Sequence, residues 1–75
     1  MSTATILIFS PARFGGVLAE SGVSKRALTQ RIGSTATTVV YRYLSGQKTP
    51  KPETVAKLAD ALGVKVEDLC VGVEL

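Results

Sequence analysis

The sequence contains no histidine and no tryptophan, and Cys70 is its only cysteine. A single cysteine cannot form a disulfide within the chain. With no histidine and one thiol, a zinc site lacks the nitrogen and sulfur ligands that it needs. The missing histidine also excludes Ser–His–Asp and Cys–His catalysis, so the sequence predicts a protein that is not an enzyme and needs no cofactor or metal.

Long apolar runs are absent as well. The longest, residues 6–9, is far shorter than a membrane span, and it lacks the basic flank of a secretory signal. We therefore expect a cytoplasmic chain with no membrane partner. Its 75 residues fit one small domain, and the modest core of such a domain favours completion by a second subunit.

Charge is divided unevenly along the chain. Residues 1–51 contain seven basic side chains and one acidic one, a net charge of +6, whereas residues 52–75 contain two basic and five acidic side chains, a net charge of −3. A domain divided in this way attracts a polyanion with one end only. Ordinary solvated surface charge is the alternative interpretation.

Apolar spacing and helix-end signals predict five helices. Ser10-Pro11 is typical of an N-cap followed by proline at the first helical position, and Ser24 is a second N-cap. Glycines follow the first four predicted helices. We expect helices over residues 11–21, 25–32, about 36–45, 52–62 and about 66–70. Their inward positions are predicted to be Phe14, Val17, Leu18, Leu28, Ile32, Val40, Tyr43, Leu44, Val55, Leu58, Ala59 and Leu62.

The two ends of the chain have a different pattern. Residues 5–9 are β-branched and apolar, typical of a short strand or packed arm, and residues 71–75 alternate as a weak strand does. Pairing of these segments into a small terminal sheet is a further hypothesis. The fold class is thus predicted as all-α with five helices, to which terminal strands can be added. The chain divides into an arm over 1–9, a helical domain over 10–70 and a tail over 71–75.

The stretch between Ser24 and Gly46 is helix, glycine-centred turn, helix, which is the order of a helix-turn-helix unit. A resemblance to a known family is carried by three parts of the sequence: Gly22-Val23-Ser24-Lys25-Arg26-Ala27-Leu28-Thr29-Gln30-Arg31-Ile32-Gly33, Tyr43-Leu44-Ser45-Gly46-Gln47-Lys48-Thr49-Pro50, and residues 53–64 with 67–69. Over about residues 14–69 the chain resembles the DNA-binding domain of lambda-type repressors and Cro proteins. This implies a five-helix fold that reads the DNA major groove with its third helix.

The resemblance implies which side chains meet DNA. On the third helix, Thr37, Thr38, Tyr41 and Arg42 are expected to contact base edges, with Tyr41 doing so from the flank of the helix. The Arg42 fork can bond guanine in a bidentate manner. Phosphate contacts are expected at the N-terminus of the second helix, around the third helix and in the loop after it: Ser24, Lys25, Arg26, Thr35, Ser45, Lys48, Thr49 and Lys51. Arg13 and Arg31 are predicted to be solvated.

Three features depart from the family pattern. The stretch from Gly33 to Gly46 is one residue longer than usual. We place the extra residue in the turn, and the alternative is a recognition helix shifted by one position with Thr35 as its N-cap. Leu18 and Leu44 occupy the positions of an Arg–Glu ion pair common in the family, a replacement that well-packed apolar residues tolerate. Lys25 stands in place of a frequent glutamine.

The predicted function is sequence-specific binding of double-stranded DNA as a phage or bacterial repressor or Cro-like regulator. The partners implied are a palindromic operator and a second copy of the chain, with no small-molecule ligand evident. The expected dimer surface is the apolar C-terminal series Leu69, Val71, Val73 and Leu75. Two alternatives stay open: a protein-interaction module of antitoxin or adaptor type on the same fold, and an accessory factor in DNA recombination or excision.

Overall fold

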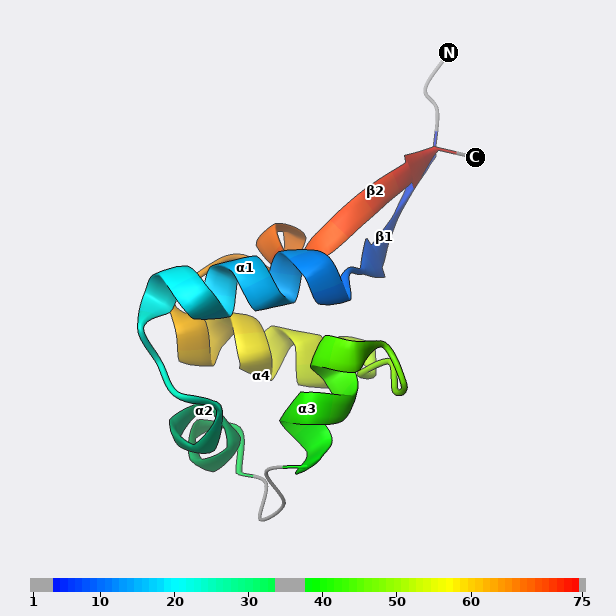
Figure 1. The fold of residues 1–75 in the computed structure, drawn as a ribbon. Coiled ribbons are helices and arrows are strands. Elements are labelled where there is room, and N and C mark those ends of the chain that lie inside the picture. Colours follow the sequence, from blue (N-terminus) through cyan, green and yellow to red (C-terminus); the bar gives the residue numbers. More distant parts are fainter. Residues whose placement is uncertain (1–3, 34–37, 75) are drawn as a thin grey trace.

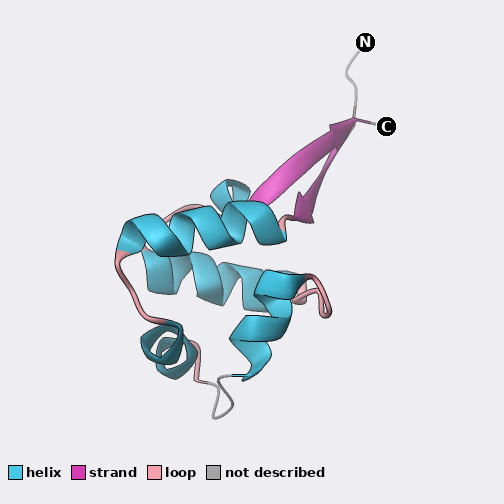
Figure 2. Ribbon diagram, in the orientation of Figure 1, coloured by secondary structure: helices cyan, strands magenta, loops and turns pink. Residues whose placement is uncertain are grey.

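The computed structural model describes residues 4–33 and 38–74. In this part of the chain a cluster of helices is joined to a two-stranded ribbon that projects from it (Figures 1 and 2). The elements follow the order β1 (Thr5–Phe9), α1 (Pro11–Ser21), α2 (Lys25–Arg31), α3 (Thr38–Ser45), α4 (Pro52–Leu62), the 3₁₀ helix η1 (Val66–Leu69) and β2 (Cys70–Glu74). None of the described helices is long and apolar enough to cross a membrane.

Local signals set the limits of the helices, as the sequence predicts. The Ser10 hydroxyl accepts a hydrogen bond from the Arg13 N–H at 3.2 Å, and the Ser24 hydroxyl accepts one from the Ala27 N–H at 3.0 Å. Both bonds satisfy a backbone donor that has no partner within its helix. At the other end, α1 stops at Gly22, whose φ of 70° is accessible to glycine at little cost.

The apolar faces of all four α-helices meet in one core. Phe14 of α1, Leu28 of α2, Val40 of α3, Leu58 of α4 and Leu69 of η1 are each fully buried. Tyr43, Val55, Ala59 and Leu62 complete the centre, so the predicted inward faces are confirmed, with Val17, Ile32 and Leu44 half-buried at its margin. This shared core fixes the position of α2 and α3 relative to each other and to the ribbon.

The terminal sheet is present, so the fold is mostly helical and not all-α. Strand β1 pairs with β2 in antiparallel register, from Thr5 opposite Glu74 to Phe9 opposite Cys70. At the root of the ribbon the Phe9 ring packs 5.5 Å from the Phe14 ring, centroid to centroid. The Ser10 N–H donates to the Leu69 carbonyl at 2.9 Å, which ties the ribbon to the helical body.

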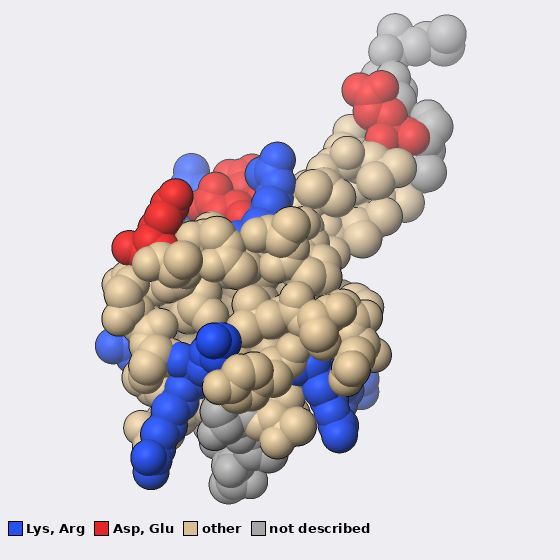
Figure 3. Space-filling view, in the orientation of Figure 1, with Lys and Arg blue, Asp and Glu red and all other residues tan. Residues whose placement is uncertain are grey.

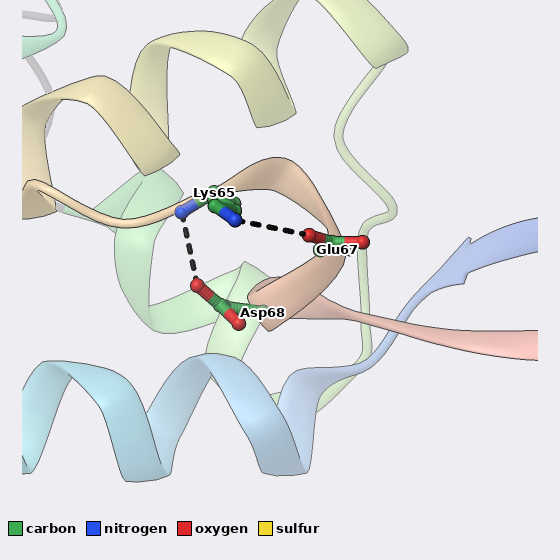
Figure 4. A network of polar contacts seen from close by, with 3 residues as sticks. All are labelled: Lys65, Glu67 and Asp68. Atoms are coloured by element: carbon green, nitrogen blue, oxygen red, sulfur yellow. Dashed lines mark hydrogen bonds and ion pairs between the residues drawn. The ribbon is translucent and has the colours of Figure 1, made fainter.

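The fifth helix differs from its prediction. In place of an α-helix over residues 66–70, the chain makes one 3₁₀ turn, Val66–Leu69, and Cys70 already belongs to β2. Within this turn the Asp68 carboxylate accepts a hydrogen bond from the Lys65 N–H at 3.0 Å, and Lys65 Nζ lies 3.9 Å from Glu67 Oε1 (Figure 4). The turn does not continue as a helix because the next residue, Cys70, already pairs with Phe9 in the sheet.

The predicted position of Leu69 is also wrong. The sequence assigns it to the dimer surface with Val71 and Val73, but its side chain is fully buried in the core. Leu69 faces the helices because it ends η1, one residue before the strand alternation begins. It cannot contribute to a contact between protomers, whereas Val71 and Val73 are exposed. Leu75 lies outside the described residues.

Candidate nucleic-acid interface

The outer face of α3 is a continuous exposed stripe. Val40 and Tyr43 point into the core, which leaves Thr38, Tyr41, Arg42 and Ser45 exposed. These four positions are spaced i, i+3, i+4 and i+7, so they lie on one side of the helix. The predicted inward and outward faces of α3 are therefore confirmed over the described residues.

Two of the predicted contacts cannot be placed on this face. Thr35 and Thr37 lie outside the described residues, as does the turn that contains the extra residue. The burial of Val40 and Tyr43 agrees with the register that keeps both at core positions. The contacts expected of Thr35 and Thr37 stay predictions.

Helix α2 brings a cation beside this stripe. The Lys25 Nζ lies 5.1 Å from the centroid of the Tyr41 ring, within the range of a cation–π contact. Lys25 is half-buried, whereas Arg26 next to it is exposed. Tyr41 thus positions the Lys25 ammonium at the junction of α2 and α3, a role that sequence reasoning missed because the two residues are 16 positions apart.

The loop after α3, residues 46–51, is held close to the end of that helix. The Lys48 N–H donates to the Arg42 carbonyl at 3.3 Å, and the Ser45 hydroxyl donates to the same carbonyl at 3.1 Å. Pro50 is buried, while Lys48, Thr49 and Lys51 are exposed around it. One buried proline therefore anchors a loop whose polar side chains face solvent beside α3.

Charge follows this arrangement in space. Figure 3 shows lysine and arginine side chains without visible acidic ones on the side where α2 and α3 lie, whereas acidic side chains lie on the ribbon and, mixed with basic ones, near α1 and η1. We use the name basic end for the cations Lys25, Arg26, Arg42, Lys48 and Lys51. The sequence difference between the two halves of the chain is thus also a spatial one.

A groove separates α1 from the basic end. It has a volume of about 850 Å³, and Leu18 and Leu44 lie in its lining together with Lys25 and Tyr41. Leu18 is buried and Leu44 half-buried. These are the two leucines that replace the ion pair common in the family, so α1 and α3 meet there through apolar contact without a buried charge to satisfy.

Arg31 is exposed, as the sequence predicts, but it also makes a contact that the sequence did not predict. Its Nη1 donates to the Ala61 carbonyl at 2.9 Å, near the C-terminus of α4. A guanidinium at a helix C-terminus satisfies a carbonyl that has no partner within the helix and faces the negative end of the helix dipole. Arg31 thus ties α2 to α4 and is set apart from the basic end. Arg13 is exposed, as predicted.

The remaining groups to consider are the carboxylates and the thiol of Cys70. Across residues 4–33 and 38–74, no three His, Cys, Asp or Glu side chains lie together as metal ligands. Cys70 is buried, and burial raises the pKa of its thiol, an effect opposed by the positive charge of Arg13. A buried thiol with a raised pKa is a poor nucleophile at neutral pH.

Comparison with known proteins agrees with this geometry. A protein-family model described as helix-turn-helix matches residues 17–69. The match spans α2, α3 and α4, with the last part of α1 and all of η1. No curated protein and no solved structure matches the chain.

Proposed function

The chain belongs to the helix-turn-helix family of lambda-repressor and Cro type, a family of DNA-binding transcription regulators, and on that basis we propose that it is a sequence-specific repressor or Cro-like protein. In this proposal α3 enters the major groove of double-stranded DNA. The observation that carries it is the coincidence of the exposed α3 stripe with the basic end. Neither feature alone is specific, because many helical pairs expose a face and many surfaces are charged.

Base readout is assigned to the exposed stripe. Arg42, at its centre, has the planar donor fork that matches the guanine edge, worth about 1–3 kcal/mol of discrimination against a wrong base. Thr38 offers a hydroxyl to a base edge or a methyl to thymine. Thr37 is retained from the sequence prediction. Tyr41 lies on the flank, where its contact with Lys25 favours a role beside the sugar–phosphate wall over base reading.

Phosphate contacts are assigned to the groups that flank the stripe. They supply the salt-dependent affinity and fix the position of α3 on the duplex. On α2 they are Ser24, Lys25 and Arg26. On the other side of the stripe they are Ser45, Lys48, Thr49 and Lys51. Thr35, which the sequence also assigned to a phosphate, is retained as a prediction.

The active form is proposed to be a homodimer on a palindromic operator. Two-fold symmetry of the protein would match that of the site, with the two copies of α3 about one DNA turn, roughly 34 Å, apart. Of the four residues that the sequence assigned to the dimer surface, Val71 and Val73 remain available and Leu75 stays a prediction.

The test is a binding selection on random duplex DNA, performed at a low and a high salt concentration. We expect an enriched motif with two half-sites. The Arg42→Ala variant should no longer enrich the motif. The matched control Arg13→Ala, at an exposed arginine on α1, should still enrich it. Absence of any enriched motif would contradict the proposal and favour the adaptor or antitoxin module. Binding that bends DNA without a motif would favour the recombination accessory factor.

A further inference from the structure

A second pocket lies where the ribbon joins the helical body, and we name it the ribbon pocket. Its volume is about 390 Å³, and β1, the loop after α3, α4, η1 and β2 all contribute to its lining. Leu7, Ile8 and Phe9 line it on the ribbon, and Pro50 and Pro52 are among the residues that line it on the helical body. It shares no residue with the groove beside the basic end, so the two hollows are separate.

The lining of the ribbon pocket is apolar and uncharged. Among the described residues, none with a charge lines it, and its polar side chains are the Thr49 hydroxyl and the Cys70 thiol. Burial raises the pKa of the Cys70 thiol, so this group is neutral at pH 7. An ion that entered would lose its hydration and find no opposite charge in the lining. The pocket therefore favours a neutral molecule.

Both sides of the ribbon pocket are held in place without a ligand. On the ribbon side, the Ser10 N–H donates to the Leu69 carbonyl at 2.9 Å next to the end of β1. On the other side, Pro50 is buried, and the Val55 N–H donates to the Lys51 carbonyl at 2.9 Å in the first turn of α4. A pocket with such fixed walls requires little ordering when a molecule enters.

The size of the ribbon pocket fits a small molecule and not a protein. Ligand pockets have volumes of about 300–1,000 Å³, and an apolar cavity of roughly 150 Å³ already holds benzene. A stable protein–protein contact buries about 1,200–2,000 Å² in total, far more than a hollow of this size supplies. We propose that the ribbon pocket binds a neutral, mainly apolar molecule about the size of two fused rings.

Occupancy of the pocket reaches the proposed DNA interface through the loop after α3. Thr49 lines the pocket and also follows Lys48, a cation of the basic end. A molecule seated against Thr49 and Pro50 restrains this loop, and so changes the free energy of ordering it on DNA. Linkage then requires that DNA and the molecule change each other's affinity by the same factor. This coupling rests on the proposed function, whereas the binding site itself does not.

Titration of the ¹⁵N-labelled full chain with indole, followed by NMR, tests the site without any DNA. Indole is neutral and consists of two fused rings. We expect saturable shifts at the amides of Ile8, Val66 and Cys70, with a Kd of roughly 0.1–1 mM for a probe of this size. The amides of Ala19 and Leu44, in the groove beside the basic end, should not shift. Indole-3-carboxylate, the charged counterpart, should not shift the pocket amides.

A pair of matched variants locates the bound probe. Ile8→Asn should weaken indole binding by roughly 5-fold, because it places a polar amide in the apolar lining. Ile6→Asn is the control: it is the same change on the same strand, 46% exposed against 47% for Ile8, at a residue outside the lining, and should leave the Kd unchanged. Val66→Asn, in η1, should weaken binding as Ile8→Asn does. Circular dichroism melting of each variant checks that it is folded.

Several outcomes would overturn the site. Shifts that do not saturate, or that spread equally over the groove beside the basic end, would indicate general adsorption of the probe. Equal weakening by Ile8→Asn and Ile6→Asn would place the probe outside the pocket, and equal binding of indole-3-carboxylate would refute a neutral ligand. Shifts of the pocket amides with protein concentration alone would mean that a second copy of the chain covers the pocket.

The coupling is tested by fluorescence anisotropy of a labelled duplex with and without saturating indole. The Kd for DNA should change by roughly 5-fold, and the same indole concentration should have a smaller effect on Ile8→Asn. An unchanged Kd together with localised NMR shifts would overturn the coupling. Absence of DNA binding altogether would contradict the proposed function and leave the NMR result on the site as it stands, so the two failures are distinguishable.

Discussion

The salt dependence of DNA binding separates phosphate contacts from base contacts at the basic end. Five cations lie there: Lys25, Arg26, Arg42, Lys48 and Lys51. Arg42 is proposed to read a base, which leaves four to neutralise phosphates. Each neutralised phosphate contributes about −0.9 to the slope of log K against log salt, so one protomer on a half-site duplex should give a slope of about −3.6.

Two substitutions should then have different signatures. Lys48→Ala should reduce the magnitude of the slope by about 0.9 and weaken binding to selected and random duplexes equally. Arg42→Ala should leave the slope unchanged and weaken binding to the selected half-site alone by ~5- to ~150-fold, from 1–3 kcal/mol of lost discrimination. Lys65→Ala removes a positive charge outside the basic end, beside Glu67. It is the charge-matched control and should change neither the slope nor the affinity.

Fluorescence anisotropy of a labelled half-site duplex, titrated from about 50 mM to about 300 mM KCl, measures both quantities. A slope change with Arg42→Ala, and equal loss on both duplexes, would make Arg42 a phosphate contact and refute the assignment of base readout. A slope that is unchanged by Lys48→Ala would place the loop of residues 46–51 away from the DNA.

Three further predictions concern single positions. Gly16→Ala should stabilise the protein by about 0.5–1 kcal/mol, because an added Cβ meets no atom within 4 Å in the middle of α1, whereas Gly63→Ala should destabilise it because φ there is +70°; thermal melting gives both signs. Tyr41→Phe should keep DNA affinity and Tyr41→Leu should lower it by roughly 2- to 5-fold, since only the second removes the ring beneath the Lys25 ammonium; equal loss in both variants would contradict this role. The free energy of unfolding should fall as pH rises above the ordinary pKa of a thiol, since the folded chain holds the Cys70 proton more tightly than the unfolded chain, and urea titrations should show that Cys70→Ala removes this part of the pH dependence.

Much of the helical fold could be predicted because its signals are local. The Ser10 and Ser24 caps act within three residues, and Gly22 and Gly63 end their helices through their own backbone conformation. The inward faces followed from helical spacing for the same reason. The α3 stripe was predicted in this way, as the complement of the buried Val40 and Tyr43.

The errors and omissions occur where contacts are distant in sequence or where two periodicities meet. Leu69 continues the alternation of Val71 and Val73 in the sequence, but the chain changes from a 3₁₀ turn to a strand at Cys70, which turns Leu69 inward. The hydrogen bond from Arg31 to the Ala61 carbonyl spans 30 residues, so no local sequence pattern predicts it. The cation–π contact between Lys25 and Tyr41 also joins residues that are distant in the sequence, so local patterns do not predict it either.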